Sequence, residues 1–151
     1  MMHWYWQPFH RLSLEQLYDA LNLRQRVFVI EQNCLYLDAD GLDQSCWHGL
    51  GYDDNGTLQA YARIVPPKLR YPEPSIGRVI VSEQSRGKGV GQTLMQQAIA
   101  QTSDLYPGLP IRISAQAQLE VFYGTLGFAT VGELYDDTGI PHIDMLYQPP
   151  K

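Results

Sequence analysis

Apolar residues recur along the chain with two different periods, and the local period predicts a helix or a strand. Residues 4–9 alternate loosely and predict a short first strand. From 14 to 29 the apolar positions follow helical spacing. Ser13 and Gln16 form a capping box, in which each side chain satisfies an N–H group at the start of the helix. We therefore expect a strand followed by a helix of about four turns.

Residues 31–44 lose the helical period and are rich in Asp and Asn, which predicts a loop or a short second helix near the surface. The stretch from Asp38 to Asp43 is similar to the start of a calcium loop. An EF-hand needs an oxygen ligand at position five and a glutamate at position twelve, and here Leu42 and Gly49 occupy those positions. Calcium binding is therefore not expected.

The middle of the chain predicts antiparallel strands. Apolar runs at 47–52 and 58–65 are separated by a turn that contains Asn55-Gly56, and Asn-Gly between two apolar runs is a strong hairpin signal. Because proline cannot donate to a sheet ladder, the proline-rich residues 66–74 should form an exposed connection. A third strand follows at 76–81, where β-branched residues dominate.

Helices and strands then alternate to the end of the chain. An amphipathic helix begins near residue 90 and ends before Tyr106, and residues 111–113 predict a short strand. The next helix carries Phe122 and Tyr123, and Gly127 closes it at its C-terminal cap. Two last strands are expected at 128–134 and 143–147, joined by a turn.

Composition places these elements in one globular domain that spans residues 1–151. Hydrophobic residues make up 44% of the chain and charged residues 18%, and no apolar run is long enough to cross a bilayer. The N-terminus lacks a basic region followed by an apolar one, which predicts a cytoplasmic protein. Cys34 and Cys46 lack paired-cysteine spacing, so we expect neither a disulfide framework nor a cysteine-rich zinc site.

The net charge argues against two classes of partner. A formal charge of −5 provides no positive surface for nucleic acid or for an anionic membrane. A cationic small-molecule substrate is compatible with it.

The most informative stretch joins the strand at 76–81 to three alternating glycines, Gly87, Gly89 and Gly91, and then to a helix. Without side chains there, backbone N–H groups can approach a ligand, and the start of the helix adds free donors and the positive end of its dipole. A phosphate-bearing ligand fits this turn. A Walker loop needs Ser or Thr where Gly89 stands, and a dinucleotide fingerprint needs glycine where Gln92 stands.

The remaining pattern resembles the signature of the GNAT family of acetyl-CoA-dependent N-acetyltransferases. In that signature Gln or Arg is followed after two residues by Gly, and after one more by Gly or Ala; Arg86, Gly89 and Gly91 match it. The segment from Phe122 to Phe128 is similar to the family's Phe-Tyr-x-x-x-Gly-Phe. The resemblance implies an α+β GNAT (acyl-CoA N-acyltransferase) fold, with a mixed central β-sheet flanked by helices.

Within the family the chain is similar to the ElaA-like group. The similarity runs through residues 24–32 with Tyr36, Asp40 and Asp43, and through residues 139–145. Together with the two motifs, these segments cover most of the chain. The resemblance does not define the acceptor.

The resemblance also implies a binding site for acetyl-CoA as co-substrate. The strand residues Val79, Ile80 and Val81 should meet the pantetheine arm, and Gln116 stands where the family usually has asparagine. The pyrophosphate should lie on the turn and the start of the helix, formed by Arg86, Gly87, Lys88, Gly89, Val90 and Gly91. No metal is expected to take part.

Acetyl transfer to an amine needs a neutral nucleophile, stabilisation of the developing oxyanion and protonation of the departing thiolate. An alkylamine is mostly charged at neutral pH, since its reference pKa is about 10.4, so a base or a water relay must take its proton. The backbone N–H of Val81 is the expected oxyanion donor. The resemblance implies Tyr123 as the general acid, because the matching family tyrosine lies near the thioester sulfur.

Several side chains could serve as the base. Glu31 ends the first helix, where the resemblance places the wall of the acceptor site, and His142 carries an imidazole, the side chain most often used as a general base. A water relay is an equal alternative. Glu83, Glu120 and Asp144 are further carboxylates that could act.

The expected function is direct transfer of acetyl to a primary amine, of a small molecule or a peptide, in a ternary complex. The alternative is a binding module that senses acyl-CoA or assembles with partners without turnover. A third interpretation is a fold that binds another phosphorylated ligand, such as ATP. Exposed strand edges are compatible with a homodimer.

Overall fold

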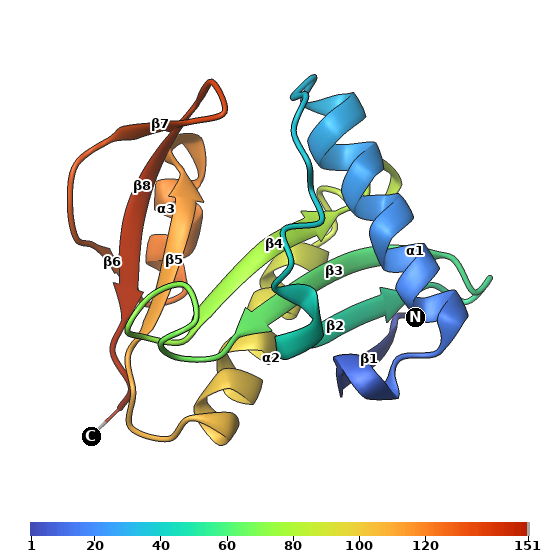
Figure 1. The fold of residues 1–151 in the computed structure, drawn as a ribbon, viewed down its shortest axis with the longest axis horizontal. Coiled ribbons are helices and arrows are strands. Elements are labelled where there is room, and N and C mark those ends of the chain that lie inside the picture. The colour runs from blue at the N-terminus through green and yellow to red at the C-terminus, as the bar shows by residue number, and fades with distance from the viewer. Residues whose placement is uncertain (151) are drawn as a thin grey trace.

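A mixed sheet of eight strands forms the framework of the computed structural model, which describes residues 1–150 (Figure 1). The strand order is β1-β2-β3-β4-β5-β8-β6, and β7 also pairs with β8. Paired strands are antiparallel except β4 and β5, which are parallel. The strands are β1 His3–Pro8, β2 Trp47–Tyr52, β3 Leu58–Val65, β4 Ser75–Val81, β5 Ile111–Gln116, β6 Phe128–Thr130, β7 Tyr135–Asp137 and β8 Ile140–Tyr147.

Helices cover both faces of the sheet. On one face lie α1 (Leu14–Arg24) and the π-helix that continues it (Gln25–Glu31), and on the other lie α2 (Val90–Leu105) and α3 (Glu120–Thr125) (Figure 1). Each face has its own apolar core, with Ile76 in the core under α2 and Ile80 in the core under α1. Short 3₁₀-helices lie at Phe9–Arg11, Asp43–Ser45, Glu83–Ser85 and Ala117–Leu119. Within residues 1–150 no helix is both long and apolar enough to cross a membrane.

Local sequence signals position the N-terminal elements as predicted. The capping box is present, with Gln16 N donating to Ser13 Oγ and Ser13 N donating to Gln16 Oε1, each at 3.0 Å. The predicted hairpin bounds, 47–52 and 58–65, match β2 and β3, and the two strands are antiparallel.

Three predictions were wrong in detail. The predicted helix over 14–29 is α-helical only to Arg24, and its wider π-helical part runs to Glu31. The predicted strand over 128–134 ends at Thr130, because Gly132 has a φ of +148°, and residues 135–137 form the separate strand β7. The last strand begins at Ile140, earlier than expected, because it pairs with β7.

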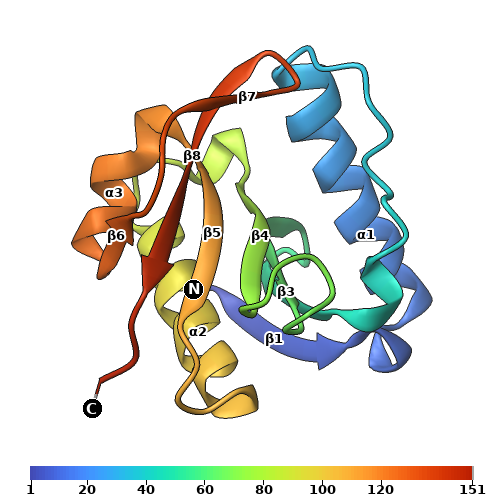
Figure 2. The same cartoon turned by 60° about the vertical axis from the view of Figure 1, so that its left-hand side comes forward.

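β4 and β5 are paired only near their beginnings. Ser75 lies opposite Arg112, and the Arg112 N–H donates to the Pro74 carbonyl at 2.9 Å. Beyond that point the two strands diverge toward their carboxyl ends (Figure 1), and Figure 2 shows α1 on one side of β4, with β5, β8 and α3 on the other. The N–H and C=O groups on the facing edges of β4 and β5 therefore lack strand partners in the very centre of the sheet.

Candidate active site

Two cavities meet where β4 and β5 separate. The first, which we call the glycine-side cavity, has a volume of about 570 Å³ and lies between β4, the glycine turn and α3. The second, the hairpin-side cavity, has a volume of about 400 Å³ and lies between β4, β5, the π-helix and the β7–β8 hairpin. Six residues line both cavities: Phe28, Gln32, Val79, Gln116, Leu119 and Tyr123. Ligands in the two cavities would meet at these residues.

The glycine turn requires glycine for its backbone conformation. Gly87 and Gly89 both have a φ of +77°, which L side chains rarely adopt, although a Cβ at either position would meet no atom within 4 Å beyond its chain neighbours. Gly89 is the N-cap of α2, whose first N–H groups have no partner within the helix. The turn therefore presents backbone donors and the positive end of a 16-residue helix to the cavity.

The structure brings together nearly all residues predicted to bind acetyl-CoA. The glycine-side cavity is lined by Val79, Ile80, Val81, Arg86, Gly87, Gly89, Val90, Gly91 and Gln116. Lys88 is exposed and does not line this cavity.

Arg86 is fixed between β4 and the π-helix. Its Nε donates to the Val81 carbonyl at 2.9 Å, and its Nη1 forms an ion pair with Glu31 Oε2 at 2.7 Å. Glu31 lines the glycine-side cavity and not the hairpin-side cavity. The structure thus places this candidate base beside the predicted phosphate-binding arginine.

The facing edge of β4 carries backbone donors. The Ser82 N–H donates to the Gln59 carbonyl of β3 at 2.8 Å, and N–H groups alternate in direction along a strand. The N–H groups of Val81 and Val79 therefore point away from β3, into the gap between β4 and β5. Of these two residues, only Val79 lines both cavities.

Tyr123 lies at the junction of the cavities, on α3. Its side chain is 6% exposed and packs edge-on against the rings of Phe122 and Phe128. No group of residues 1–150 makes a hydrogen bond with its hydroxyl. Burial raises the pKa of Tyr123 to about 12, so the phenol keeps its proton at neutral pH.

The β7–β8 hairpin carries the other candidate base. His142 Nδ1 lies 2.8 Å from the Ile140 carbonyl oxygen, which can only accept, so Nδ1 carries a proton and the neutral ring has its lone pair on Nε2. The imidazole stacks on Tyr135 and lines the hairpin-side cavity. Asp137 also lines this cavity, and its carboxylate has no hydrogen-bonding or ionic partner within residues 1–150.

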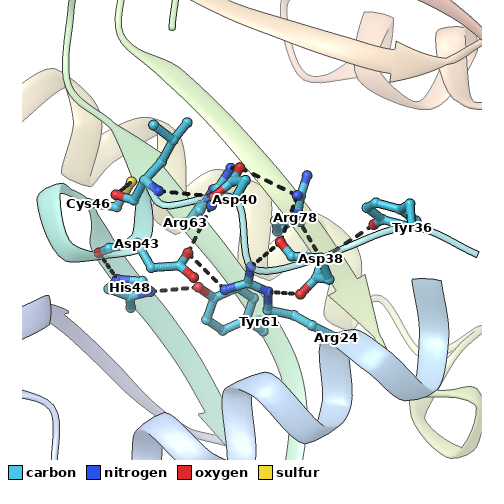
Figure 3. A network of polar contacts seen from close by, with 11 residues as sticks. Arg24, Tyr36, Asp38, Asp40, Asp43, Cys46, His48, Tyr61, Arg63 and Arg78 are labelled. Atoms are coloured by element: carbon cyan, nitrogen blue, oxygen red, sulfur yellow. Dashed lines mark hydrogen bonds and ion pairs between the residues drawn. The ribbon is translucent and has the colours of Figure 1, made fainter. Parts of the chain in front are cut away.

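A closed ring of six charges lies beside the hairpin-side cavity, and two of its members, Asp40 and Arg78, line that cavity (Figure 3). Asp38 bonds to Arg24 and Arg78, Asp40 to Arg78 and Arg63, and Asp43 to Arg63 and Arg24, with nitrogen–oxygen distances of 2.5 to 3.5 Å. We call this set the aspartate–arginine ring. Arg24 and Arg63 are 1% and 0% exposed, so two full charges are buried and each has two carboxylate partners.

The ring shifts the pKa values of Asp40, Asp43 and Arg63. Burial alone would raise the pKa of Asp40 and Asp43, but hydrogen bonds and charge from the ring arginines outweigh burial and lower both pKa values. For Arg63, burial acts to lower the pKa, and its carboxylate partners raise it. These shifts favour the charged forms of Asp40, Asp43 and Arg63 at neutral pH.

Sequence reasoning missed this ring. The aspartates were interpreted as a surface loop with a weak similarity to a calcium site, whereas Asp38 and Asp43 are buried against arginines. No group of three or more His, Cys, Asp and Glu side chains in the described part of the chain is arranged to hold a metal ion. Arg63 was the available signal, because an arginine within an apolar strand must find a carboxylate partner.

Two cavities that meet where the sheet splits suit a protein that brings two ligands together. Residues 39–148 match the family model of the acetyltransferase (GNAT) domain, and the chain belongs to that family. The mixed sheet confirms the predicted GNAT fold.

Within the family the chain is similar to ElaA, which confirms the predicted group. ElaA of Escherichia coli is 46% identical over 144 residues, covering 93% of this chain and 94% of that protein. The crystal structure of E. coli ElaA has a TM-score of 0.93 at 43% identity, covering 98% of this chain and 100% of that chain.

Two further proteins extend this similarity. An acyl-CoA N-acyltransferase from Pseudomonas aeruginosa has a TM-score of 0.93 at 39% identity, covering 97% of this chain and 99% of that chain. A UPF0039 protein of Synechocystis is 49% identical over 149 residues, covering 99% of this chain and 97% of that protein. Family membership supports acyl-CoA-dependent acetyl transfer as the general activity.

Proposed function

We propose that this protein transfers acetyl from acetyl-CoA to a primary amine, by direct attack in a ternary complex. The observation that carries the proposal is the junction of the two cavities at Val79, Gln116 and Tyr123. A donor in the glycine-side cavity and an acceptor in the hairpin-side cavity can meet there without either leaving its site.

The glycine-side cavity fits acetyl-CoA by the chemistry of its lining. The turn at Gly87 and Gly89 and the start of α2 offer backbone donors for the pyrophosphate, and Arg86 adds a positive charge. The free edge of β4 offers donors and acceptors for the amide groups of the pantetheine arm. Acetyl-CoA supplies the thioester, and the residues of the chain supply positioning, oxyanion stabilisation and proton transfer.

Three groups carry the chemistry. The Val79 N–H stabilises the developing oxyanion, in place of the Val81 N–H expected from the sequence, because Val79 lines both cavities. His142 accepts the proton of the amine at Nε2, directly or through a water molecule. Tyr123 donates its phenolic proton to the departing thiolate sulfur, and its high pKa keeps that proton in place beforehand.

The acceptor is a small amine or the amine of a peptide. The volume of the hairpin-side cavity, about 400 Å³, lies within the range of about 300–1,000 Å³ for small-molecule sites. The free Asp137 carboxylate in its lining suits a cationic acceptor. A cytoplasmic location and a homodimer stay predictions.

Two measurements test the proposal. In calorimetry, acetyl-CoA and CoA should bind and ATP should not; preference for ATP would overturn the choice of co-substrate. With a panel of small amines and short peptides, thiol release from acetyl-CoA should depend on the acceptor. Tight binding of acetyl-CoA with no acceptor-dependent thiol release by any of them would instead favour the binding module.

A further inference from the structure

Between two of its paired positions β4 contains one residue more than β3, at the place where the two cavities meet. Gly77 pairs with Arg63 and Ile80 with Tyr61, so Arg78 and Val79 together lie opposite a single residue of β3. The extra residue reverses the alternation of side chains: Ile76 and Ile80, which would share a face in a regular strand, pack in the cores on opposite faces.

At the bulge, Arg78 has a backbone conformation that is unfavourable for residues other than glycine. Its φ is +51°, in the left-handed region that residues other than glycine rarely adopt. Such a conformation persists only where the surrounding structure holds it. The Val79 N–H follows directly, so the direction of this donor depends on how firmly the bulge is held.

The side chain of Arg78 holds the β4 bulge in place through its contacts with Asp38. Its Nε donates to Asp38 Oδ1 at 2.9 Å, and its Nη2 donates to the Asp38 carbonyl at 3.1 Å. The guanidinium also lies over the rings of Phe28 and Tyr36, at 6.0 and 5.9 Å from their centroids. The rest of the ring ties Asp38 to Arg24, whose side chain is buried, so the bulge is fastened to α1 (Figure 3).

We propose that Arg78 and Asp38 are positioning residues for acetyl transfer. They hold the β4 bulge so that the Val79 N–H points at the thioester carbonyl of the acetyl donor. This inference rests on the proposed function and assigns the contact between Arg78 and Asp38 a part in it beyond stability.

The ring provides a matched pair of variants. Asp38→Asn removes a carboxylate that contacts Arg78, whereas Asp43→Asn removes a carboxylate that contacts Arg24 and Arg63 but not Arg78. The infrared carbonyl stretch of bound acetyl-CoA, labelled with ¹³C at the carbonyl carbon, reports polarisation by the Val79 N–H. This readout needs no acceptor.

In the wild-type protein we expect the carbonyl stretch to move to lower frequency on binding. Asp38→Asn should lose most of this movement and Asp43→Asn should keep it, with acetyl-CoA dissociation constants within about threefold of the wild type in both. With an amine that supports turnover, kcat should fall by about tenfold or more in Asp38→Asn alone, after correction for the folded fraction. If Asp38→Asn does not fold, Arg78→Lys, which keeps the charge but lacks the fork of donors, takes its place.

An unchanged carbonyl stretch in Asp38→Asn, or an equal change in both aspartate variants, would overturn the inference and leave the proposed function standing. Failure of the wild-type protein to bind acetyl-CoA would overturn both.

Discussion

The glycine turn and the aspartate–arginine ring are built in opposite ways, although both bear on Val79. The turn lines the glycine-side cavity together with Val79, and Arg78 of the ring precedes Val79 in the sequence. The turn consists of neighbours in the sequence, Gly87 to Gly91, with a conformation set by local backbone chemistry. The ring joins α1, a loop, β3 and β4, and its contact between Asp38 and Arg78 spans 40 residues. The glycine turn therefore depends on local backbone conformation, whereas the aspartate–arginine ring depends on the tertiary structure that brings its four segments together.

Removal of a ring arginine should have the largest effect in the molecule. Arg24→Ala leaves Asp38 and Asp43 with one arginine partner fewer each in a buried setting, which should lower the free energy of unfolding by about 3–5 kcal/mol. Arg26→Ala, two residues further along, removes an exposed arginine whose side chain, within residues 1–150, bonds only to Asn22, and should cost less than about 0.5 kcal/mol. Urea denaturation measures both, and equal costs would show that the ring contributes little to stability.

Loss of the Tyr123 hydroxyl should come next. Tyr123→Phe keeps the ring packed against Phe122 and Phe128 but removes the proton donor, so kcat should fall by about 100-fold with acetyl-CoA affinity nearly unchanged. Steady-state kinetics and calorimetry separate the two quantities. Equal turnover by the variant would remove the acid role.

The pH profile sharpens this prediction. Because burial raises the pKa of Tyr123 to about 12, the phenol should stay protonated, and wild-type kcat should not decline on the alkaline side below about pH 11 while the protein stays folded. A decline with a midpoint near the ordinary tyrosine value of about 10 would contradict the buried setting of this residue.

A strained glycine should have a smaller effect, confined to the donor. Gly89→Ala places a side chain at a φ of +77°, which costs about 1–2 kcal/mol of stability and displaces the turn, so we expect acetyl-CoA to bind about tenfold more weakly. Gly56 in the β2–β3 hairpin has the same φ and equally open surroundings. Gly56→Ala should therefore cost similar stability and leave the affinity unchanged, and a similar loss of affinity in both would point to a global effect.

The same contrast explains what the sequence could predict. Asn55-Gly56 and the glycines of the turn act on their immediate neighbours, so the β2–β3 hairpin, α2 and the phosphate-binding turn were predictable. The π-helix was not, because a pattern of apolar residues does not distinguish it from an α-helix. The ring was missed because each aspartate finds its partner on a distant element, and only the tertiary fold selects which arginine it meets.

Glu31 contacts Arg86 beside the glycine turn, whereas it was predicted from the sequence as a candidate base in the acceptor site. Variants at Glu31 therefore test which of the two cavities this residue serves. In its ion pair with Arg86, the Glu31 side chain is 37% exposed and the Arg86 side chain 42%, and exposed ion pairs contribute little to stability. Glu31→Gln removes a negative charge near the expected pyrophosphate and frees Arg86, so acetyl-CoA should bind about two- to threefold more tightly with kcat nearly unchanged.

A base role for Glu31 requires the opposite pattern, a fall in kcat of about 100-fold or more with little change in affinity. His142→Gln is the matched variant, because it removes the other candidate base and leaves the Arg86 pair intact. If kcat falls in Glu31→Gln and not in His142→Gln, the amine loses its proton in the glycine-side cavity. The assignment of proton removal to His142 in the hairpin-side cavity would then be wrong. If neither variant lowers kcat, a water relay takes the proton of the amine.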